Sequence, residues 1–170
     1  KGYFTEKNIS LGHRRLSIID LDKRSNQPMT YNDLTIIFNG EIYNFKKIKK
    51  DLEKEEIKFD TKSDTEVLLK AYSVYKEKIL NKLEGMFAFA IYDKKNNEIF
   101  IARDRLGVKP LYYYLNKNKF AFSSEIKSLL TLNLDTKLDK ESITEDTGSD
   151  AMNKDGTTFR FWLSVFEPFN

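Results

Sequence analysis

The sequence contains no cysteine and a single histidine, His13, among its 170 residues. Without Cys, the chain cannot form disulfides, bind zinc through thiolates or supply a thiol nucleophile of its own. One His also excludes a metal site built from several imidazoles, and we expect no metal here. Pro occurs three times and Gly seven times, so no Pro-rich or Gly-rich linker is evident before about residue 135.

Charge of one sign and long apolar runs are also scarce. Lys and Arg number 29 against 26 Asp and Glu, for a net charge of +3, and so small an excess does not favour nucleic acid or an acidic membrane surface. The longest apolar runs are about eight residues, far below the roughly 20 that span a bilayer. No signal-peptide pattern opens the chain. We therefore expect a cytoplasmic protein that binds neither nucleic acid nor membrane.

Hydrophobic residues make up 40% of the chain, with 13 Phe and 9 Tyr, which is typical of a folded domain. Apolar residues every three or four positions predict amphipathic helices that begin at Glu41 and Thr65, and a shorter helix at residues 76–82. Residues 25–32 are polar and predict a loop. Apolar and β-branched stretches predict strands at residues 11–19, 34–38, 85–92, 98–103, 111–115 and 119–123.

The predicted strands are apolar at nearly every position, yet their spacing is that of antiparallel hairpins. Two stacked antiparallel sheets with helices on both outer faces satisfy both observations. We therefore expect an α+β fold, a four-layer αββα sandwich. Residues 144–158 are polar and predict a linker or a disordered segment, whereas the aromatic run at 159–166 predicts a strand or a docking segment.

Asn39 and Gly40 are the first candidates for chemistry. Asn-Gly is typical of a hairpin turn, but that interpretation needs a second strand after Gly40, and a helical period follows instead. At a strand-to-helix junction, the Asn amide and the next backbone N–H can stabilise a developing oxyanion. The residues alone leave both interpretations open.

Two further stretches also allow a structural and a functional interpretation. Ser63 and Glu66 have the spacing of a helix capping box, and Asp64 suits the first turn of that helix, although it could instead bind a substrate ammonium. Of the adjacent residues Arg14 and Arg15, one faces each side of the predicted sheet, and an inward Arg needs a carboxylate from the protein or from a ligand. His13 is interpreted as structural, and residues 103–105 as an ion-paired corner.

Seven motifs occur in an order that resembles a known family. They are Gly12-His-Arg-Arg-Leu-Ser-Ile-Ile-Asp20, Gln27-Pro-Met29, Asn39-Gly-Glu-Ile-Tyr-Asn44, Ser63-Asp-Thr-Glu-Val67, Gly85-Met-Phe-Ala-Phe-Ala90, Ala102-Arg-Asp-Arg-Leu-Gly-Val-Lys-Pro-Leu-Tyr-Tyr113 and Ser124-Glu-Ile-Lys127. Over about residues 10–140, the chain resembles the glutaminase domain of glutamine-hydrolysing asparagine synthetases, a class II glutamine amidotransferase. The resemblance implies the αββα fold of N-terminal-nucleophile hydrolases.

The resemblance also implies a glutamine pocket and a role for each of its residues. Arg15 would hold the glutamine α-carboxylate, Asn39 and Gly40 would form the oxyanion hole, and Glu41 and Asp64 would hold the α-ammonium. Opposite charges at the two ends of the pocket match a zwitterion. The implied pocket comprises Arg15, Leu16, Ser17, Ile18, Ile19, Asn39, Gly40, Glu41 and Asp64.

The chain departs from the family in two ways. The family's nucleophile is an N-terminal Cys with its own α-amine as base, whereas this chain begins with Lys and has no Cys. We therefore interpret the chain as an N-terminally truncated fragment that is inactive alone, and we expect its parent to begin Met-Cys-Gly. Residues 1–140 are assigned to a partial amidotransferase domain and residues 141–170 to a tail or linker outside the family.

The expected function is that of the ammonia-producing domain of an asparagine synthase-type amidotransferase, with glutamine as substrate. Its partner would be the synthetase domain of the parent chain, which would bind ATP, magnesium and aspartate, while this domain needs no cofactor. A homodimer is a further assembly to consider. One alternative is an amidotransferase of surface polysaccharide biosynthesis with another acceptor. The other is a non-catalytic binding or scaffold relative, against which the intact Arg15, Asn39 and Asp64 weigh.

Overall fold

The computed structural model describes residues 1–7, 9–14, 25–115, 119–132, 150–152 and 158–162. The strands in this part are β1 Gly2–Glu6, β2 Ile9–His13, β3 Met29–Tyr31, β4 Leu34–Ile42, β5 Gly85–Asp93, β6 Glu98–Arg103, β7 Tyr112–Leu115, β8 Phe120–Ser123, β9 Asp150–Met152 and β10 Thr158–Trp162. The helices are α1 Phe45–Lys54, α2 Asp64–Tyr75, the 3₁₀ helix η2 Lys76–Lys82 and α3 Ile126–Leu130.

The central sheet has the strand order β3-β4-β5-β6-β10-β9, and β1-β2 and β7-β8 form two smaller sheets. Its first four strands are antiparallel neighbours, as the hairpin spacing predicted. β10 pairs with β6 in parallel, with Phe159 opposite Ile99, so the whole sheet is mixed. The aromatic run near the C-terminus thus contributes a strand to the sheet.

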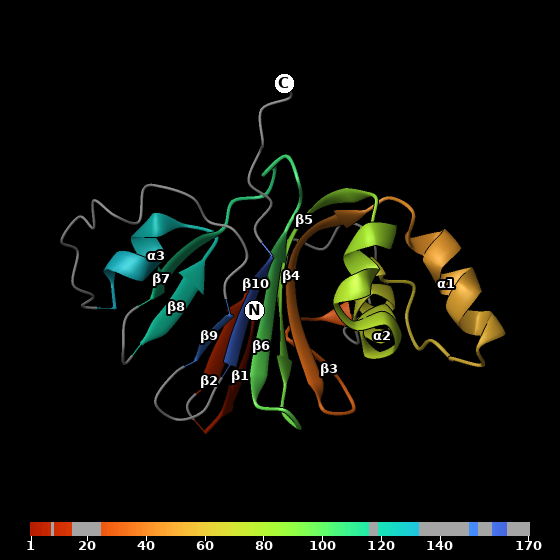
Figure 1. Cartoon of the computed structure of the whole chain (residues 1–170), viewed down its shortest axis with the longest axis horizontal. Helices are drawn as coiled ribbons and strands as arrows, with labels where there is room; N and C mark the ends of the chain where they lie inside the picture. Colours follow the sequence, from red (N-terminus) through yellow and green to blue (C-terminus); the bar gives the residue numbers. More distant parts are fainter. Residues whose placement is uncertain (8, 15–24, 116–118, 133–149, 153–157, 163–170) are drawn as a thin grey trace.

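Both faces of the central sheet are covered, which explains why β5 and β6 are apolar at nearly every position. Helix α2 lies against one face and α1 packs against α2, so that both helices contribute to a core that includes Ile36 and Phe89 (Figure 1). The hairpin β1-β2 contributes to a second core on the other face, around Tyr92 and Ile101, against which Leu111, Phe120 and Phe122 also pack. A mixed α/β architecture with antiparallel sheets is therefore confirmed.

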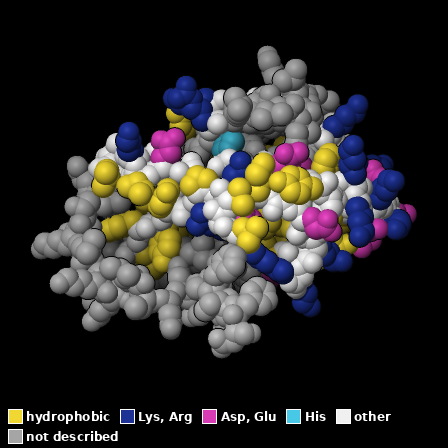
Figure 2. Space-filling model, turned by 90° about the horizontal axis from the view of Figure 1, so that it is seen from above, with side chains coloured by type: hydrophobic (Ala, Val, Ile, Leu, Met, Phe, Trp, Pro, Cys, Tyr) yellow, Lys and Arg dark blue, Asp and Glu magenta, His cyan; other side chains and the backbone are white. Residues whose placement is uncertain are grey.

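Helix α1 shows the amphipathic pattern that predicted it. Ile48 and Leu52 are buried in the core that also contains Ile36 and Phe89, while the Lys and Glu residues between them are mostly exposed. Figure 2 shows charged side chains of both signs gathered at the end of the molecule that carries this helix. In the described part of the chain, no helix is long and apolar enough to cross a membrane.

Several predicted boundaries differ from the structure. The loop predicted at residues 25–32 contains the short strand β3, because its Met29 and Tyr31 pair with β4. The strand predicted at 34–38 continues to Ile42, and the helix predicted from Glu41 begins only at Phe45, because β5 pairs with β4 along its full length. The strand predicted at 11–19 ends at His13, and residues 15–19 lie outside the described part.

Candidate functional site

The site is built on the edge of β4 that β3 leaves open. β3 pairs with β4 only as far as Met29 opposite Ile36, whereas β5 continues to the end of β4. Backbone N–H groups alternate between the two edges of a strand. The N–H groups of Phe38, Gly40 and Ile42 therefore point to the open edge, beyond the end of β3.

Side chains accept the two outer hydrogen bonds of this edge. The Phe38 N–H donates to Oε1 of Gln27 at 2.6 Å, and the Ile42 N–H donates to Oδ2 of Asp64 at 3.2 Å. The N–H of Gly40 lies between these two donors and points in the same direction. Asn39 and Gly40 thus belong to the interior of a strand, so both the hairpin turn and the strand-to-helix junction are wrong as descriptions of their backbone.

Gly40 is required by the close approach of β5. Its φ is 155°, and a Cβ built on it would overlap the carbonyl oxygen of Met86 and lie 2.7 Å from Cα of Phe87. A side chain at this position would push the two strands apart. The glycine therefore keeps the N–H of residue 40 in its place beside Asn39.

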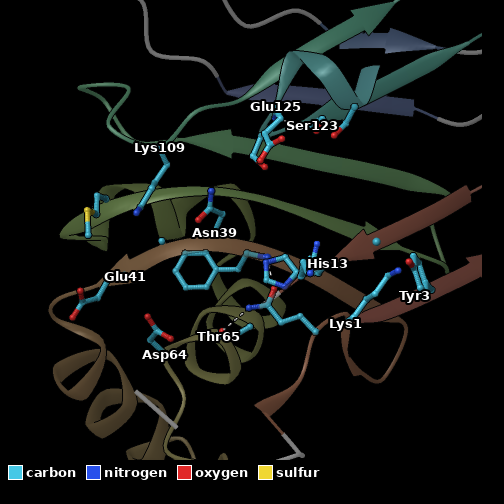
Figure 3. A pocket seen from close by; sticks show the side chains of 18 residues that line it. Lys1, Tyr3, His13, Asn39, Glu41, Asp64, Thr65, Lys109, Ser123 and Glu125 are labelled. Carbon is cyan, nitrogen blue, oxygen red and sulfur yellow. Dashed lines mark hydrogen bonds between the residues drawn. The ribbon is translucent and has the colours of Figure 1, made fainter. Parts of the chain in front are cut away.

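A cavity of about 740 Å³ opens at this edge, and Asn39, Gly40, Glu41 and Asp64 all line it. Figure 3 shows Glu41 and Asp64 at one end of the cavity, Lys1 and Tyr3 at the other, and Asn39 and His13 between them. The structure thus brings together four of the nine residues that the resemblance assigns to the glutamine pocket. Arg15, Leu16, Ser17, Ile18 and Ile19 lie outside the described residues.

The acidic end of the cavity contains a buried carboxylate. Asp64 is only 5% exposed, and this burial raises the pKa of its carboxyl. Hydrogen bonds from the Ile42 and Thr65 N–H groups oppose this rise in pKa, while the nearby charge of Glu41 adds to it. An ammonium group placed between the two carboxylates would relieve their repulsion.

The N-terminus of α2 holds Asp64 at the cavity wall. Ser63 is the N-cap, and its Oγ accepts a hydrogen bond from the Thr65 N–H at 3.1 Å. The predicted return bond from Glu66 to Ser63 is wrong, because the Ser63 N–H donates to Thr61 Oγ1 at 3.2 Å. Glu66 turns instead to the preceding loop and to Lys70, so only half of the capping box forms.

Among the described residues, the corner at residues 103–105 is held by hydrogen bonds to backbone groups, and the ion pairs that we predicted are not found there. Asp104 accepts hydrogen bonds from the N–H groups of Phe87, Val108 and Lys109 at 3.2, 2.9 and 3.0 Å. Arg103 donates to the carbonyl oxygens of Gly107 and Lys109. The corner presents Lys109 to the cavity, which places a positive charge in its lining.

Gln27, Thr65 and Lys109 line the cavity and were not assigned to it from the sequence. Each lies within one of the seven motifs, so the signal was present, but their side chains reach the site only through the packing of distant elements. His13, interpreted as structural, also lines the cavity. Within the described residues, no group of three His, Asp or Glu side chains is arranged as metal ligands.

Comparison with known proteins identifies the family. Residues 1–166 match the family described as glutamine amidotransferase domain. The chain belongs to this family. The match confirms the resemblance inferred from the seven motifs, and it extends into the segment that we assigned to a tail outside the family.

The relatives of this amidotransferase domain are enzymes. Asparagine synthetase [glutamine-hydrolyzing] 1 of Bacillus subtilis is 47% identical over 144 residues, which cover 84% of this chain and 23% of that protein. Asparagine synthetase [glutamine-hydrolyzing] 3 of the same species is 40% identical over 157 residues, covering 89% of this chain and 25% of that protein. The chain thus spans about a quarter of the length of these curated relatives.

A solved structure shares the fold of the domain. The glutamine phosphoribosylpyrophosphate amidotransferase of B. subtilis, complexed with ADP and GMP, matches with a TM-score of 0.59 and 28% sequence identity. The match covers 71% of this chain and 28% of that one. An amidotransferase fold is therefore supported by structure as well as by sequence.

Proposed function

We propose that this chain forms the glutamine-hydrolysing, ammonia-producing domain of an asparagine synthase-type amidotransferase. The observation that carries the proposal is the open edge of β4, where the Gly40 N–H and the Asn39 side chain meet a cavity that also holds two carboxylates. Two donors beside a cation site are what a glutamine amide and its α-ammonium require.

Binding of glutamine would use both charges of the amino acid. Asp64 and Glu41 would receive the α-ammonium at the acidic end of the cavity, where the buried carboxylate gains most from a cation. Arg15 would receive the α-carboxylate, and the backbone of Leu16 to Ile19 would line that end. The side-chain amide of glutamine would then lie near Asn39 and Gly40.

Hydrolysis would proceed through a tetrahedral intermediate. A thiolate attacks the amide carbon, the carbonyl oxygen becomes an oxyanion, and the Asn39 amide and the Gly40 N–H donate hydrogen bonds to it. Collapse of the intermediate releases ammonia and leaves a thioester, which water hydrolyses to glutamate. The 170 residues hold no Cys, so the thiol would come from outside them, and these residues would be inactive without it.

The same proposal includes the complete fold of the domain and its partner domain. The hairpins β1-β2 and β7-β8 would belong to one second sheet, which completes a four-layer αββα sandwich with α3 on its outer side. A synthetase domain would use ATP and magnesium to activate aspartate and would accept the ammonia in the cytoplasm. The names of the relatives support aspartate as the acceptor.

The test compares glutamine with ammonia as nitrogen source in the full-length protein, with ATP, magnesium and aspartate present. Asparagine should form from either source, and glutamate should form in step with it only when glutamine is supplied. If asparagine formed when ammonia was supplied but not when glutamine was supplied, the glutaminase role would be rejected. Amide transfer from glutamine with no use of aspartate would instead favour another acceptor, such as a sugar carboxylate.

A further inference from the structure

The side chain of Gln27 joins the two halves of the candidate site. Its Oε1 accepts a hydrogen bond from the Phe38 N–H at 2.6 Å, and its Nε2 donates to Oγ1 of Thr65 at 3.3 Å (Figure 3). Phe38 directly precedes Asn39 on β4, and Thr65 directly follows Asp64 on α2. One buried side chain thus links the residues next to the oxyanion donor and next to the carboxylate.

The orientation of the amide follows from its partners. A backbone N–H can only donate, so the oxygen of Gln27 must face Phe38 and the nitrogen must face Thr65. Gln27 is 5% exposed and Thr65 is 2% exposed, so water does not compete freely for either bond. The bridge is therefore well defined and largely shielded from solvent.

Gln27 replaces a strand partner where β3 has ended. Continuing the register of Met29 opposite Ile36 would place Gln27 opposite Phe38. The Gln27 side chain supplies the acceptor that a backbone carbonyl would supply in a longer strand. The backbone of Gln27 also packs closely on β1, because a Cβ on Gly2 would overlap the Gln27 carbonyl oxygen.

We infer that Gln27 is a positioning residue that sets the oxyanion donors of β4 at a fixed distance from the ammonium site of α2. On the open edge of β4, Gln27 and Asp64 hold the N–H groups on either side of Gly40. Without the bridge, β4 and the start of α2 could shift relative to each other. The inference rests on the proposed function, because it concerns the same pocket.

The first experiment uses Gln27→Met in the full-length protein, since Met has a similar length and cannot make either hydrogen bond. A shift of the donors should lower kcat/KM for glutamine by about a hundredfold, while ammonia-dependent turnover stays unchanged. A kcat/KM within twofold of the wild type would overturn the inference. Equal loss of glutamine-dependent and ammonia-dependent turnover would also overturn it, because that result indicates general unfolding.

The second experiment removes only the bond to α2. Thr65→Val should raise the KM for glutamine about tenfold with a smaller effect on kcat, and Thr65→Ser, which keeps the hydroxyl, should restore most of the affinity. Thr35→Val is the matched control, because the buried Thr35 hydroxyl bonds to Thr30 at 3.1 Å elsewhere on β4. A KM that rises equally in Thr35→Val and Thr65→Val would overturn the inference.

A third measurement does not depend on activity. Amide hydrogen exchange of Phe38 should be faster in Gln27→Met than in the wild type, while exchange of the Ile36 amide, within the β3–β4 pairing, should be unchanged. Equal exchange rates of Phe38 in both proteins would show that the bridge is absent. A wild type that releases no ammonia from glutamine would reject the proposed function, and Phe38 exchange would still decide whether Gln27 holds β4.

Discussion

Two buried carboxylates near the candidate site, Asp64 and Asp104, have pKa values shifted in opposite directions. Asp64 is buried, and this burial raises the pKa of its carboxyl, to which the nearby charge of Glu41 adds. Asp104 shows the opposite balance. Burial alone would raise the pKa of Asp104, but hydrogen bonds from the Val108, Lys109 and Phe87 N–H groups lower it overall. The two buried carboxylates therefore differ in how far backbone N–H groups compensate their burial: fully enough to lower the pKa for Asp104, and only in part for Asp64.

The oxyanion role of Asn39 predicts a defect in the chemical step. Asn39→Ala in the full-length protein should lower the kcat for glutamine by about a hundredfold to a thousandfold with a smaller change in KM, because the lost donor acts in the transition state. Ammonia-dependent turnover should be retained. Asn44→Ala is the control, since Asn44 bonds to Lys82 and Glu84 instead of lining the cavity. Full glutaminase activity in Asn39→Ala would contradict the assignment.

The raised pKa of Asp64 predicts a pH-dependent cost in stability. The folded protein binds this proton more tightly than the unfolded chain, so stability falls as pH rises from 3.8, the ordinary pKa, through the higher folded-state pKa. Asp64→Asn keeps an acceptor for the Ile42 N–H and removes the charge. It should therefore melt at a higher temperature than the wild type at pH 7, with a gap that closes toward pH 3.8. Thermal melts that differ equally at every pH would contradict this.

At the scale of elements, a buried ion pair fixes the loop before α2. Glu66 accepts hydrogen bonds from the N–H groups of Asp60 and Thr61 at 2.9 and 2.7 Å and from Lys70 Nζ at 2.6 Å. Lys70 also donates to the Lys58 carbonyl oxygen at 2.7 Å. Because this loop leads directly into Ser63 and the start of α2, the network contributes to the position of the helix end that carries Asp64.

Removing one partner of this pair should destabilise the domain strongly. Glu66→Ala would leave the buried Lys70 ammonium without its carboxylate partner and the Asp60 and Thr61 N–H groups without their acceptor, at a cost of about 3–5 kcal/mol in the free energy of unfolding. Chemical denaturation would measure the change. Asp51→Ala, which removes the exposed partner of Lys54 on α1, should leave the melting temperature unchanged. Similar effects of the two substitutions would contradict the structural role of Glu66.

At the scale of the whole molecule, strand β10 joins distant parts of the chain. It extends the central sheet beyond β6 through five paired positions, from Thr158 opposite Glu98 to Trp162 opposite Ala102. The family match reaches residue 166, so sequence similarity and sheet pairing both continue past residue 140. The domain boundary that we placed at residue 140 stays a prediction.

The role of β10 can be tested by shortening the chain. A protein that ends at Lys140 loses the partner of β6 and exposes the backbone of a strand whose Ile99 and Ile101 are buried. An unpaired apolar edge promotes association, so we expect oligomers in size-exclusion chromatography with light scattering and a broad melt. The full 170-residue chain is the control. A sharp, monomeric melt of the shortened protein would show that β10 is dispensable.

The sequence by itself determined the family, the antiparallel strand pairs and the candidate residues around Asn39 and Asp64. The pattern of apolar residues in a sequence reflects which residues are buried. β5, β6, α1 and α2 could be predicted because each contributes buried residues to the core. The pattern of apolar residues could not place the end of β4, because Glu41 and Ile42 fit a strand as well as the first turn of a helix. Pairing with β5 decided that question.

Only the tertiary structure decided how the site is assembled. Gln27 lies 11 residues from Phe38 and 38 from Thr65 along the chain, and its role depends on contacts that no local pattern encodes. Glu66 has the spacing of a capping box, yet Lys70 and the preceding loop offered better partners once α2 was packed. Local sequence determines which backbone states are favourable, whereas the partners of buried polar groups are chosen by which groups the folded chain brings within hydrogen-bond distance.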